Sequence, residues 1–307
     1  MKTCVLTAIA GLAAAVAPSF GQSRFLINDR TNDSIWAVHD RNGNGMIDQP
    51  DEVSRFFSSA NAAGTLAISN PTCLAVRADG LVLMGDQGNR CVYLVHDLNR
   101  DGNGQGLGES VVAADATNAS AVSLAFPTGA AFDSLGRAYV VNAGNSFGND
   151  AIYRLVDLDM DGQFQSTGEI TEYVGAPAFG PGNGAFSPQE MAFDFSTSPL
   201  VGYMHDSAST TRGVYRFVDL NGNGRADDPG EFTTYFNATN ASGLLLGAGF
   251  ALTMDAARPG AMYILQTLTG PIRQLIRLKD GNGNNTAQDA GEAVVVWQTT
   301  ESGFTEI

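Results

Sequence analysis

Short runs of alternating hydrophobic and polar residues, separated by turn residues, fill the chain beyond its first 21 residues. The clearest set begins with Gly129–Asp133 and Arg137–Asn142 and continues with Ala151–Asp157 and Ile170–Val174. Each run has the length and the two-residue period of a strand, and none keeps the period of an amphipathic helix. The pattern therefore predicts an all-β protein built from short strands and turns.

This set of four strands is repeated along the chain. The third strands read IWAVHD, VYLVHD, AIYRLVD, VYRFVD and LIRLKD, and the second strands include RFLIND, LVLMGD, VGYMHD and AMYILQ. The Asp residues that end the third strands are 57, 60, 62 and 61 residues apart. A repeat of about 60 residues with four strands is typical of a propeller blade with long loops. We therefore predict that residues 22–307 form one β-propeller domain of five four-stranded blades.

The chain does not begin at the first strand of a repeat. The chain enters in the register of a second strand, at Arg24–Asp29, and leaves after a fourth strand, at Ala293–Trp297. Gly303–Ile307 resembles the start of a first strand, so we expect it to complete the N-terminal blade and close the ring, which removes exposed sheet edges. Because Gly303–Ile307 is short for a strand, an incomplete six-bladed ring is the alternative.

Residues 1–21 have the features of a signal peptide. Lys2 supplies a basic start, and Val5–Ala17 is an apolar stretch too short to cross a bilayer. Pro18 would block cleavage directly after Ala17, so we expect cleavage after Gly21. The mature chain is then expected to be secreted, periplasmic or at the cell surface, without membrane insertion.

The composition is acidic, with 32 Asp and Glu residues against 17 Lys and Arg and a formal net charge of −15. Such a surface repels nucleic acid and attracts cations, so no nucleic-acid partner is expected. Cys73 and Cys91 are predicted to begin two strands that flank a third, about 9–10 Å apart. We therefore predict no disulfide between them, and the lack of paired Cys and His spacing disfavours zinc.

A known propeller repeat is similar to part of each unit. The segment Val82–Leu94, VLMGDQGNRCVYL, resembles the NHL-type repeat, in which a strand ends in Asp and Gly-Asn-Arg leads into the next strand. Ala138–Leu155 and Phe25–Val38 are looser versions. The resemblance covers about a third of each repeat and implies a propeller fold. It leaves activity open, because such propellers include scaffolds, binding modules and hydrolases.

An acidic loop follows each third strand and carries oxygen-bearing side chains at fixed positions. With the Asp that ends the strand as position 1, Asp or Asn recurs at positions 3 and 5, another oxygen donor at position 9 and Glu at position 13. These residues are Asp40, Asn42, Asn44, Asp48 and Glu52; Asp97, Asn99, Asp101, Gln105 and Glu109; Asp157, Asp159, Asp161, Gln165 and Glu169; Asp219, Asn221, Asn223, Asp227 and Glu231; and Asp280, Asn282, Asn284, Gln288 and Glu292. Position 6 is Gly45, Gly102, Gly162, Gly224 or Asn285, the residue types that best tolerate the positive φ of a sharp turn.

These loops predict calcium sites. Ca²⁺ takes six to eight oxygen ligands, which alternate side chains of a tightly turned loop can supply, whereas Mg²⁺, the alternative ion, prefers a strict octahedron with retained waters. The loops resemble the calcium loops of EF-hand and dockerin domains. They differ in placing the Glu at position 13 rather than 12 and in having strands as flanks, so an EF-hand switch is excluded. An Asx-turn hairpin without metal is the remaining alternative.

A second candidate site lies where the second strands end, because these ends converge around the axis of a propeller. The residues there are Asn28, Asp29, Asp86, Asn142, His205, Asp206 and Gln266. We favour a role as turn caps over a ligand site. The alternative is a metal-dependent hydrolase of the esterase, lactonase or phosphoesterase type that uses His205, Asp206 and Asp86 as catalytic candidates.

The function we predict is that of a calcium-binding propeller outside the cytoplasm that serves as a binding or scaffold module. No catalytic motif of the serine hydrolase, zinc protease or phosphate-loop type is present, so binding is preferred over catalysis. The expected partner is an extracellular protein or glycan, and the chain is expected to be a monomer.

Overall fold

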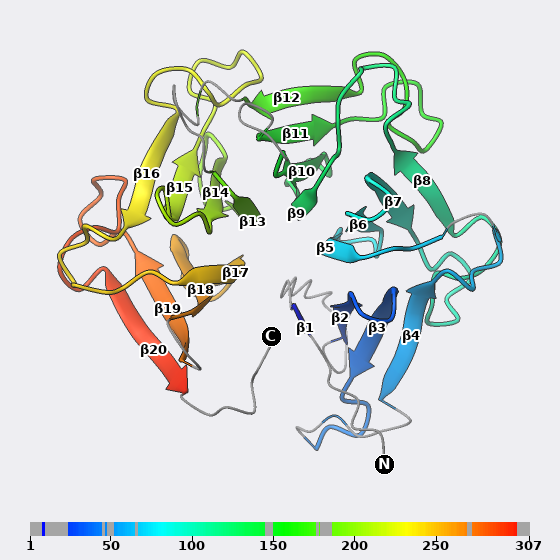
Figure 1. The fold of residues 1–307 in the computed structure, drawn as a ribbon, viewed down its shortest axis with the longest axis horizontal. Coiled ribbons are helices and arrows are strands. Elements are labelled where there is room, and N and C mark those ends of the chain that lie inside the picture. The colour runs from blue at the N-terminus through cyan, green and yellow to red at the C-terminus, as the bar shows by residue number, and fades with distance from the viewer. Residues whose placement is uncertain are drawn as a thin grey trace.

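The computed structural model describes residues 8–9, 24–44, 47, 52–64, 67–144, 150–175, 178, 186–268 and 272–299. These residues form five four-stranded antiparallel sheets arranged as the blades of a β-propeller (Figure 1). The described part of the chain contains no helix, and hence none that could span a bilayer. The predicted fold class and blade number are confirmed.

Each blade is a meander in which the strands pair in chain order. The first blade has β1 (Ala8–Ile9), β2 (Arg24–Asp29), β3 (Ser34–His39) and β4 (Val53–Ser58). The second has β5 (Pro71–Val76), β6 (Val82–Asp86), β7 (Cys91–Val95) and β8 (Ser110–Ala114). The third has β9 (Pro127–Phe132), β10 (Ala138–Asn142), β11 (Ala151–Leu155) and β12 (Ile170–Val174). The fourth has β13 (Pro188–Asp194), β14 (Val201–Asp206), β15 (Gly213–Phe217) and β16 (Phe232–Asn237), and the fifth has β17 (Ala248–Met254), β18 (Ala261–Thr267), β19 (Arg273–Lys279) and β20 (Ala293–Thr299).

The first strands of blades 2 to 5 line the axis of the ring. β5, β9, β13 and β17 pack side by side there, and the fourth strands lie at the rim (Figure 1). Side chains on these inner strands join the blades: Thr72 Oγ1 donates to the carbonyl of Pro127, and Thr128 Oγ1 donates to that of Pro188 over 2.8 Å. Both threonines occupy β-bulges, which turn the extra residue toward the neighbouring blade.

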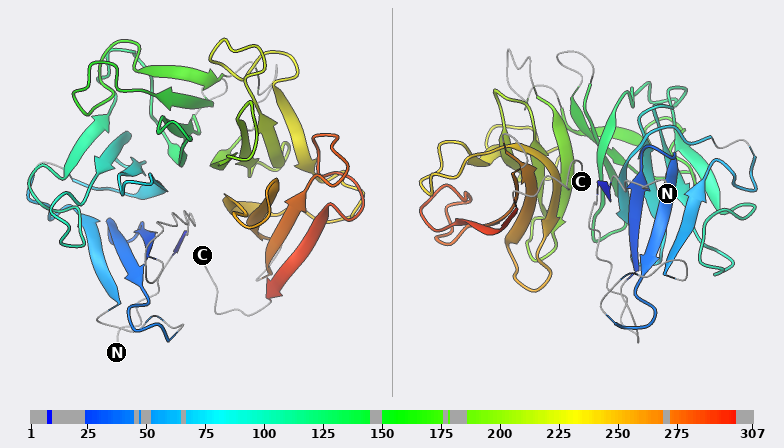
Figure 2. Two further views of the ribbon diagram at one scale, coloured as in Figure 1. Left: turned by 180° about the vertical axis from the view of Figure 1, so that it is seen from behind. Right: turned by 60° about the horizontal axis from the view of Figure 1, so that its bottom comes forward.

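The first blade differs from the others at its inner edge. The two-residue strand β1 pairs with β2 there, with Ala8 opposite Asp29 and Ile9 opposite Asn28. Gly303–Ile307, which we expected at this position, lies outside the described residues. Among the described strands, extensive contacts join each blade to the next along the chain and do not join the fifth to the first. The seam of the ring therefore lies between β17–β20 and β1–β4 (Figure 2).

In the described residues the hydrophobic core forms four layers, which lie between blades 1 and 2, 2 and 3, 3 and 4, and 4 and 5. The layer between blades 3 and 4 is the most aromatic: Tyr139 packs edge-on against Phe193 and Tyr173, with ring centroids 4.7 and 5.1 Å apart. Such pairs add about 0.5–1.5 kcal/mol beyond the burial of their area. Cys73 and Cys91 are buried and unbonded, as predicted, on β5 and β7 of blade 2.

A carboxyl group is buried near the axis of the ring, on the first strand of blade 4. Glu190 lies in the bulge of β13, and its Oε1 accepts the backbone N–H groups of Ala130 (3.3 Å) and Met191 (3.2 Å). Burial raises the pKa of this carboxyl from 4.5 to about 8. Because the charged form loses its hydration there, Glu190 is protonated at neutral pH.

Candidate metal loops and axial face

The acidic loops join the third and fourth strand of each blade. Position 6 has positive φ in every loop where it is described: 94° at Gly102, 82° at Gly162, 86° at Gly224 and 64° at Asn285. Gly45 lies outside the described residues. The prediction that this position makes a left-handed turn is confirmed, and it explains why only Gly and Asn occur there.

The Asp at position 1 folds back over the turn. In blades 2 to 5 its Oδ2 accepts the N–H of position 6, over 3.0, 2.9, 2.9 and 2.8 Å at Asp97, Asp157, Asp219 and Asp280. In blade 1, Asp40 Oδ1 accepts the N–H of Gly43 over 2.7 Å. The second oxygen of Asp97 is buried and has no hydrogen-bond partner among the described residues. The anchor carboxylates are thus held inside their loops.

Positions 3 and 5 are exposed, and their side-chain oxygens accept backbone N–H groups two residues further on. Asn99 Oδ1 accepts the N–H of Asp101 over 2.8 Å, and Asp101 Oδ1 accepts that of Asn103 over 3.0 Å. The same bonds recur from Asp159, Asp161, Asn221, Asn223, Asn282 and Asn284. Asp101 Oδ1 and Asn284 Oδ1 each accept a second bond, from Asn103 Nδ2 and Thr286 Oγ1. An oxygen that accepts only one bond keeps a second lone pair, so part of this ordered set has capacity for a further ligand.

The Glu at position 13 holds the loop through hydrogen bonds to its backbone. It is buried in all five blades, and in blade 3 its Oε1 accepts the N–H of Leu158 over 2.8 Å while its Oε2 accepts that of Ser166 over 2.8 Å. Glu109, Glu231 and Glu292 bridge the two arms of their loops in the same way, and Glu52 accepts two N–H groups from its own loop. Each carboxylate is therefore engaged with the backbone before any ion is considered.

The side chain at position 9 faces the preceding blade rather than its own loop. Gln105 Oε1 accepts from Ser58 over 2.8 Å, and Gln288 Nε2 donates to Asn237 over 3.0 Å. Asp227 accepts the N–H of Gly175 over 3.2 Å. Asp48 lies outside the described residues. In blades 2, 4 and 5 the side chain at position 9 thus bonds to the preceding blade, and no hydrogen bond within the described residues joins it to positions 1, 3 or 5.

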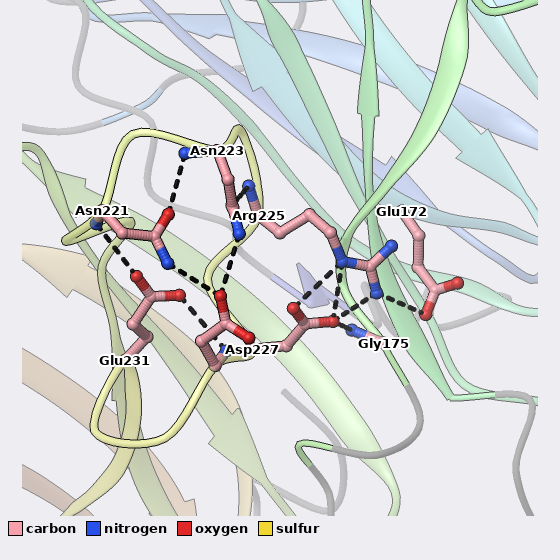
Figure 3. Close-up of polar contacts among 8 residues, drawn as sticks. Glu172, Gly175, Asn221, Asn223, Arg225, Asp227 and Glu231 are labelled. Carbon is pink, nitrogen blue, oxygen red and sulfur yellow. Dashed lines mark hydrogen bonds and ion pairs between the residues drawn. The ribbon is translucent and has the colours of Figure 1, made fainter.

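In blades 2 to 5, backbone groups at positions 8 and 9 connect the loop to the preceding blade. At position 8, the N–H groups of Gly104, Phe164, Ala226 and Ala287 donate to carbonyls in β4, β8, β12 and β16 over 2.6–2.9 Å. At position 9, the carbonyls of Gln105, Gln165 and Gln288 accept N–H groups that follow the same strands, each over 2.7 Å. We call these contacts the blade clasp. Figure 3 shows side-chain contacts that accompany the clasp in blade 4, where Arg225 pairs with Glu172 of blade 3 and Asp227 accepts the N–H of Gly175.

Position 10, which we did not select from the sequence, faces the loop interior. Asp228 Oδ2 accepts the side-chain amides of Asn221 (2.7 Å) and Asn223 (2.8 Å), contacts that Figure 3 draws. Asp289 does the same for Asn282 and Asn284 in blade 5. In blade 3, Ser166 Oγ donates to Asp159 over 2.7 Å. In blades 4 and 5 a carboxylate at position 10 thus accompanies the neutral Asn residues at positions 3 and 5.

Blade 3 has the most compact set of carboxylates in the described residues. Oxygen atoms of Asp157, Asp159 and Glu169 all lie within 4.8 Å of one another. They come from position 1, an exposed position 3 and the buried position 13. This spacing suits a single divalent cation with hard oxygen ligands.

The axial residues are mainly turn caps, the role that we favoured. Asp86 accepts the N–H groups of Ser69 (2.7 Å) and Asn89 (2.9 Å). Asp206 accepts those of Ser187 (2.8 Å) and Ala208 (3.1 Å). Asp29, Asn142 and Gln266 accept backbone N–H groups in the same way. Burial raises the pKa of both Asp86 and Asp206.

His205 is an exception on this face. It is 1% exposed, and neither ring nitrogen has a hydrogen-bond partner among the described residues. Gly249 of the next blade makes room for the ring, since a Cβ there would lie 2.2 Å from His205 Cε1. Burial, with a smaller contribution from the positive charge of Arg212, lowers the pKa of His205 to about 4. The imidazole is therefore neutral at physiological pH.

Comparison with known proteins supports the fold. No family model and no curated protein matches the sequence. Among solved structures, the nidogen/laminin complex is similar at 15% identity and a TM-score of 0.51, covering 84% of this chain and 71% of that chain. A catalytically inactive virginiamycin B lyase from Staphylococcus aureus with quinupristin is similar at 13% identity and 0.50, covering 96% and 72%. Kuenenia stuttgartiensis hydrazine synthase is similar at 12% identity and 0.50, covering 92% of this chain and 66% of that chain.

At these identities the likeness concerns the fold alone. The similar propellers include a member of a protein–protein complex and enzymes of unrelated chemistry. They share the blade architecture with this chain, and they leave its function open.

Proposed function

We propose that this protein is a secreted calcium-binding β-propeller that acts as a binding or scaffold module. The observation that carries the proposal is the repeated loop geometry, in which oxygen donors at positions 1, 3 and 5 are already held in a left-handed turn. The cluster of Asp157, Asp159 and Glu169 is its sharpest instance. A preorganised set of hard donors lowers the entropic cost of ion binding.

In this proposal, calcium would strengthen the contacts between blades. The blade clasp ties positions 8 and 9 of each loop to the preceding blade. An ion held at positions 1, 3 and 5 would restrict the same loop, which would then be less free to detach from its neighbour. The ions would thus stabilise the ring and keep its surface rigid for a partner protein or glycan.

Calorimetric unfolding tests the calcium proposal. Each independent site should add about 2.7 kcal/mol when free calcium exceeds its Kd a hundredfold. We expect the melting temperature to rise with millimolar calcium, to rise less with magnesium and to fall with chelator. The variant Asp157→Asn should reduce the calcium-dependent rise, whereas Asp255→Asn, in a turn outside the loops, should not. Identical melting curves in calcium and chelator would refute the proposal.

A binding role is preferred over the hydrolase alternative because of how the axial carboxylates are used. Asp86 and Asp206 each accept two or more backbone N–H groups, so their oxygens already serve the turns. A screen with ester, lactone and phosphoester substrates provides the test. Metal-dependent turnover that is lost in Asp206→Asn, with the fold retained, would favour the hydrolase instead.

A further inference from the structure

A groove of about 600 Å³ lies between blades 2 and 3, beside the acidic loops. Its floor is apolar and is formed by Leu94, Val111, Phe132, Leu155 and Phe164, which come from both blades. Exposed leucines also line it, Leu98 at 60% exposure and Leu135 at 77%. We call it the blade 2–3 groove. Its volume falls in the range of small-molecule sites.

The groove lies where the third strand of blade 2 has a leucine in place of an arginine. Leu94 occupies the position at which blades 3, 4 and 5 have Arg154, Arg216 and Arg277. The guanidinium of Arg154 lies against the loop of blade 4, where a Cβ added to Gly224 would be 3.3 Å from it. The matching Gly162 of blade 3 has no such neighbour: a Cβ there would meet nothing within 4 Å. Leu94 therefore leaves vacant the space that an arginine fills between blades 3 and 4.

The charges around the groove are unevenly paired. Arg77 is bound to Asp79 over 2.7 Å, and Arg137 is bound to Asp133 over 2.5 Å. Asp157 and Asp161 also line the groove, and neither forms an ion pair within the described part of the chain. The lining of the groove thus includes two carboxylates that have no basic partner within the described residues.

We propose that the blade 2–3 groove binds an organic cation, whose apolar body packs on Leu94, Phe132 and Phe164. Its amine lies beside Asp157 and Asp161, where opposite charge fixes its orientation. The proposal goes beyond the calcium function and does not depend on it. An ion in the blade 3 loop would neutralise the same carboxylates, so calcium and the organic cation compete there.

Three matched probes test the groove: 4-phenylbutylamine, 4-phenylbutanol and 4-phenylbutyrate, titrated in chelator by ligand-observed NMR. The amine binds most tightly, the alcohol more weakly and the carboxylate most weakly. Leu94→Arg places in blade 2 the arginine that three other blades have, so it preserves the fold and abolishes binding of all three probes. Asp161→Asn weakens the amine by about two- to fivefold and leaves the alcohol unchanged. Asp101→Asn, the same change in the blade 2 loop, alters neither.

Several results would overturn the groove proposal: no binding of the amine in chelator, equal affinity for amine and carboxylate, or unchanged binding in a folded Leu94→Arg protein. Repeating the titrations in calcium tests the proposal that the loops bind calcium. If calcium weakens the amine and not the alcohol, the blade 3 loop holds the ion. If the amine binds equally with and without calcium, the groove stands and a calcium site at Asp157 is refuted.

Discussion

Replacing Glu190 with Gln should make the protein more resistant to alkaline pH. The unfolded carboxyl ionises above pH 4.5, whereas the folded one keeps its proton until about pH 8. The free energy of unfolding therefore falls as pH rises through this interval, because the unfolded state gives up its proton first. Glutamine keeps the oxygen that accepts the N–H groups of Ala130 and Met191 and cannot ionise.

The size of the effect follows from the width of that interval. Each pKa unit corresponds to 1.36 kcal/mol, so the penalty for burying Glu190 reaches about 5 kcal/mol above pH 8 and about 3 kcal/mol at pH 7. The stability of Glu190→Gln relative to the parent should therefore grow by about 4 kcal/mol between pH 5 and pH 9. Below pH 4.5 both states carry the proton, and the two proteins should differ little in pH dependence.

Urea unfolding at pH 5, 7 and 9 measures this difference directly. Glu172→Gln is a suitable control, because that half-exposed carboxylate lies on the outer strand β12 beside Arg225. Its curve should follow the parent at all three pH values. If the parent and Glu190→Gln lose stability in parallel from pH 5 to pH 9, Glu190 is ionised in the folded protein and the argument from burial is wrong.

Three further predictions concern the loops and the axial face. In calcium titration calorimetry, the blade 3 loop should fill first because it has the most carboxylates, so Asp161→Ala should remove the tightest site and Asn284→Ala should leave it intact. His205→Asn should unfold at lower pH than the parent: the buried imidazole resists protonation down to about pH 4, so the parent loses stability as pH falls from 6.5 toward 4. An unchanged acid midpoint would count against this. Asp206→Ala should lower the free energy of unfolding by about 1–3 kcal/mol at pH 7, because it leaves the partly buried N–H groups of Ser187 and Ala208 unpaired. A loss no larger than that in Asp255→Ala would contradict the capping role.

The blades could be predicted from the repeat spacing because the backbone conformation of the turns and strands restricts which residue types can occur at each position. Position 6 must tolerate positive φ, so only Gly and Asn appear there, and the turn could be located from residue type alone. The strands were equally accessible, since a two-residue alternation reports which face is buried.

The roles of the loop oxygens were harder to predict, because one residue type meets different needs. Gln105 and Gln288 were selected as ligands for their oxygens, yet the structure uses these side chains between blades. A buried Glu that braces two arms of a loop and a Glu that binds an ion both require a carboxylate, so the sequence does not separate them. Asp228 and Asp289 were missed because position 10 varies among blades.

The blade clasp is one-sided, because the later blade of each pair supplies the loop that makes it. Each acidic loop from blade 2 onward carries the groups that attach it to the blade before it, so attachment is encoded in the later repeat and directed toward the N-terminus. A duplicated unit of about 60 residues would bring its own fastening to whichever blade precedes it. Within the described residues no such contact is seen on β20, the outer strand of blade 5, where Val294, Val296 and Trp297 are exposed. The contacts that join two neighbouring blades are therefore specified largely by the later repeat of each pair.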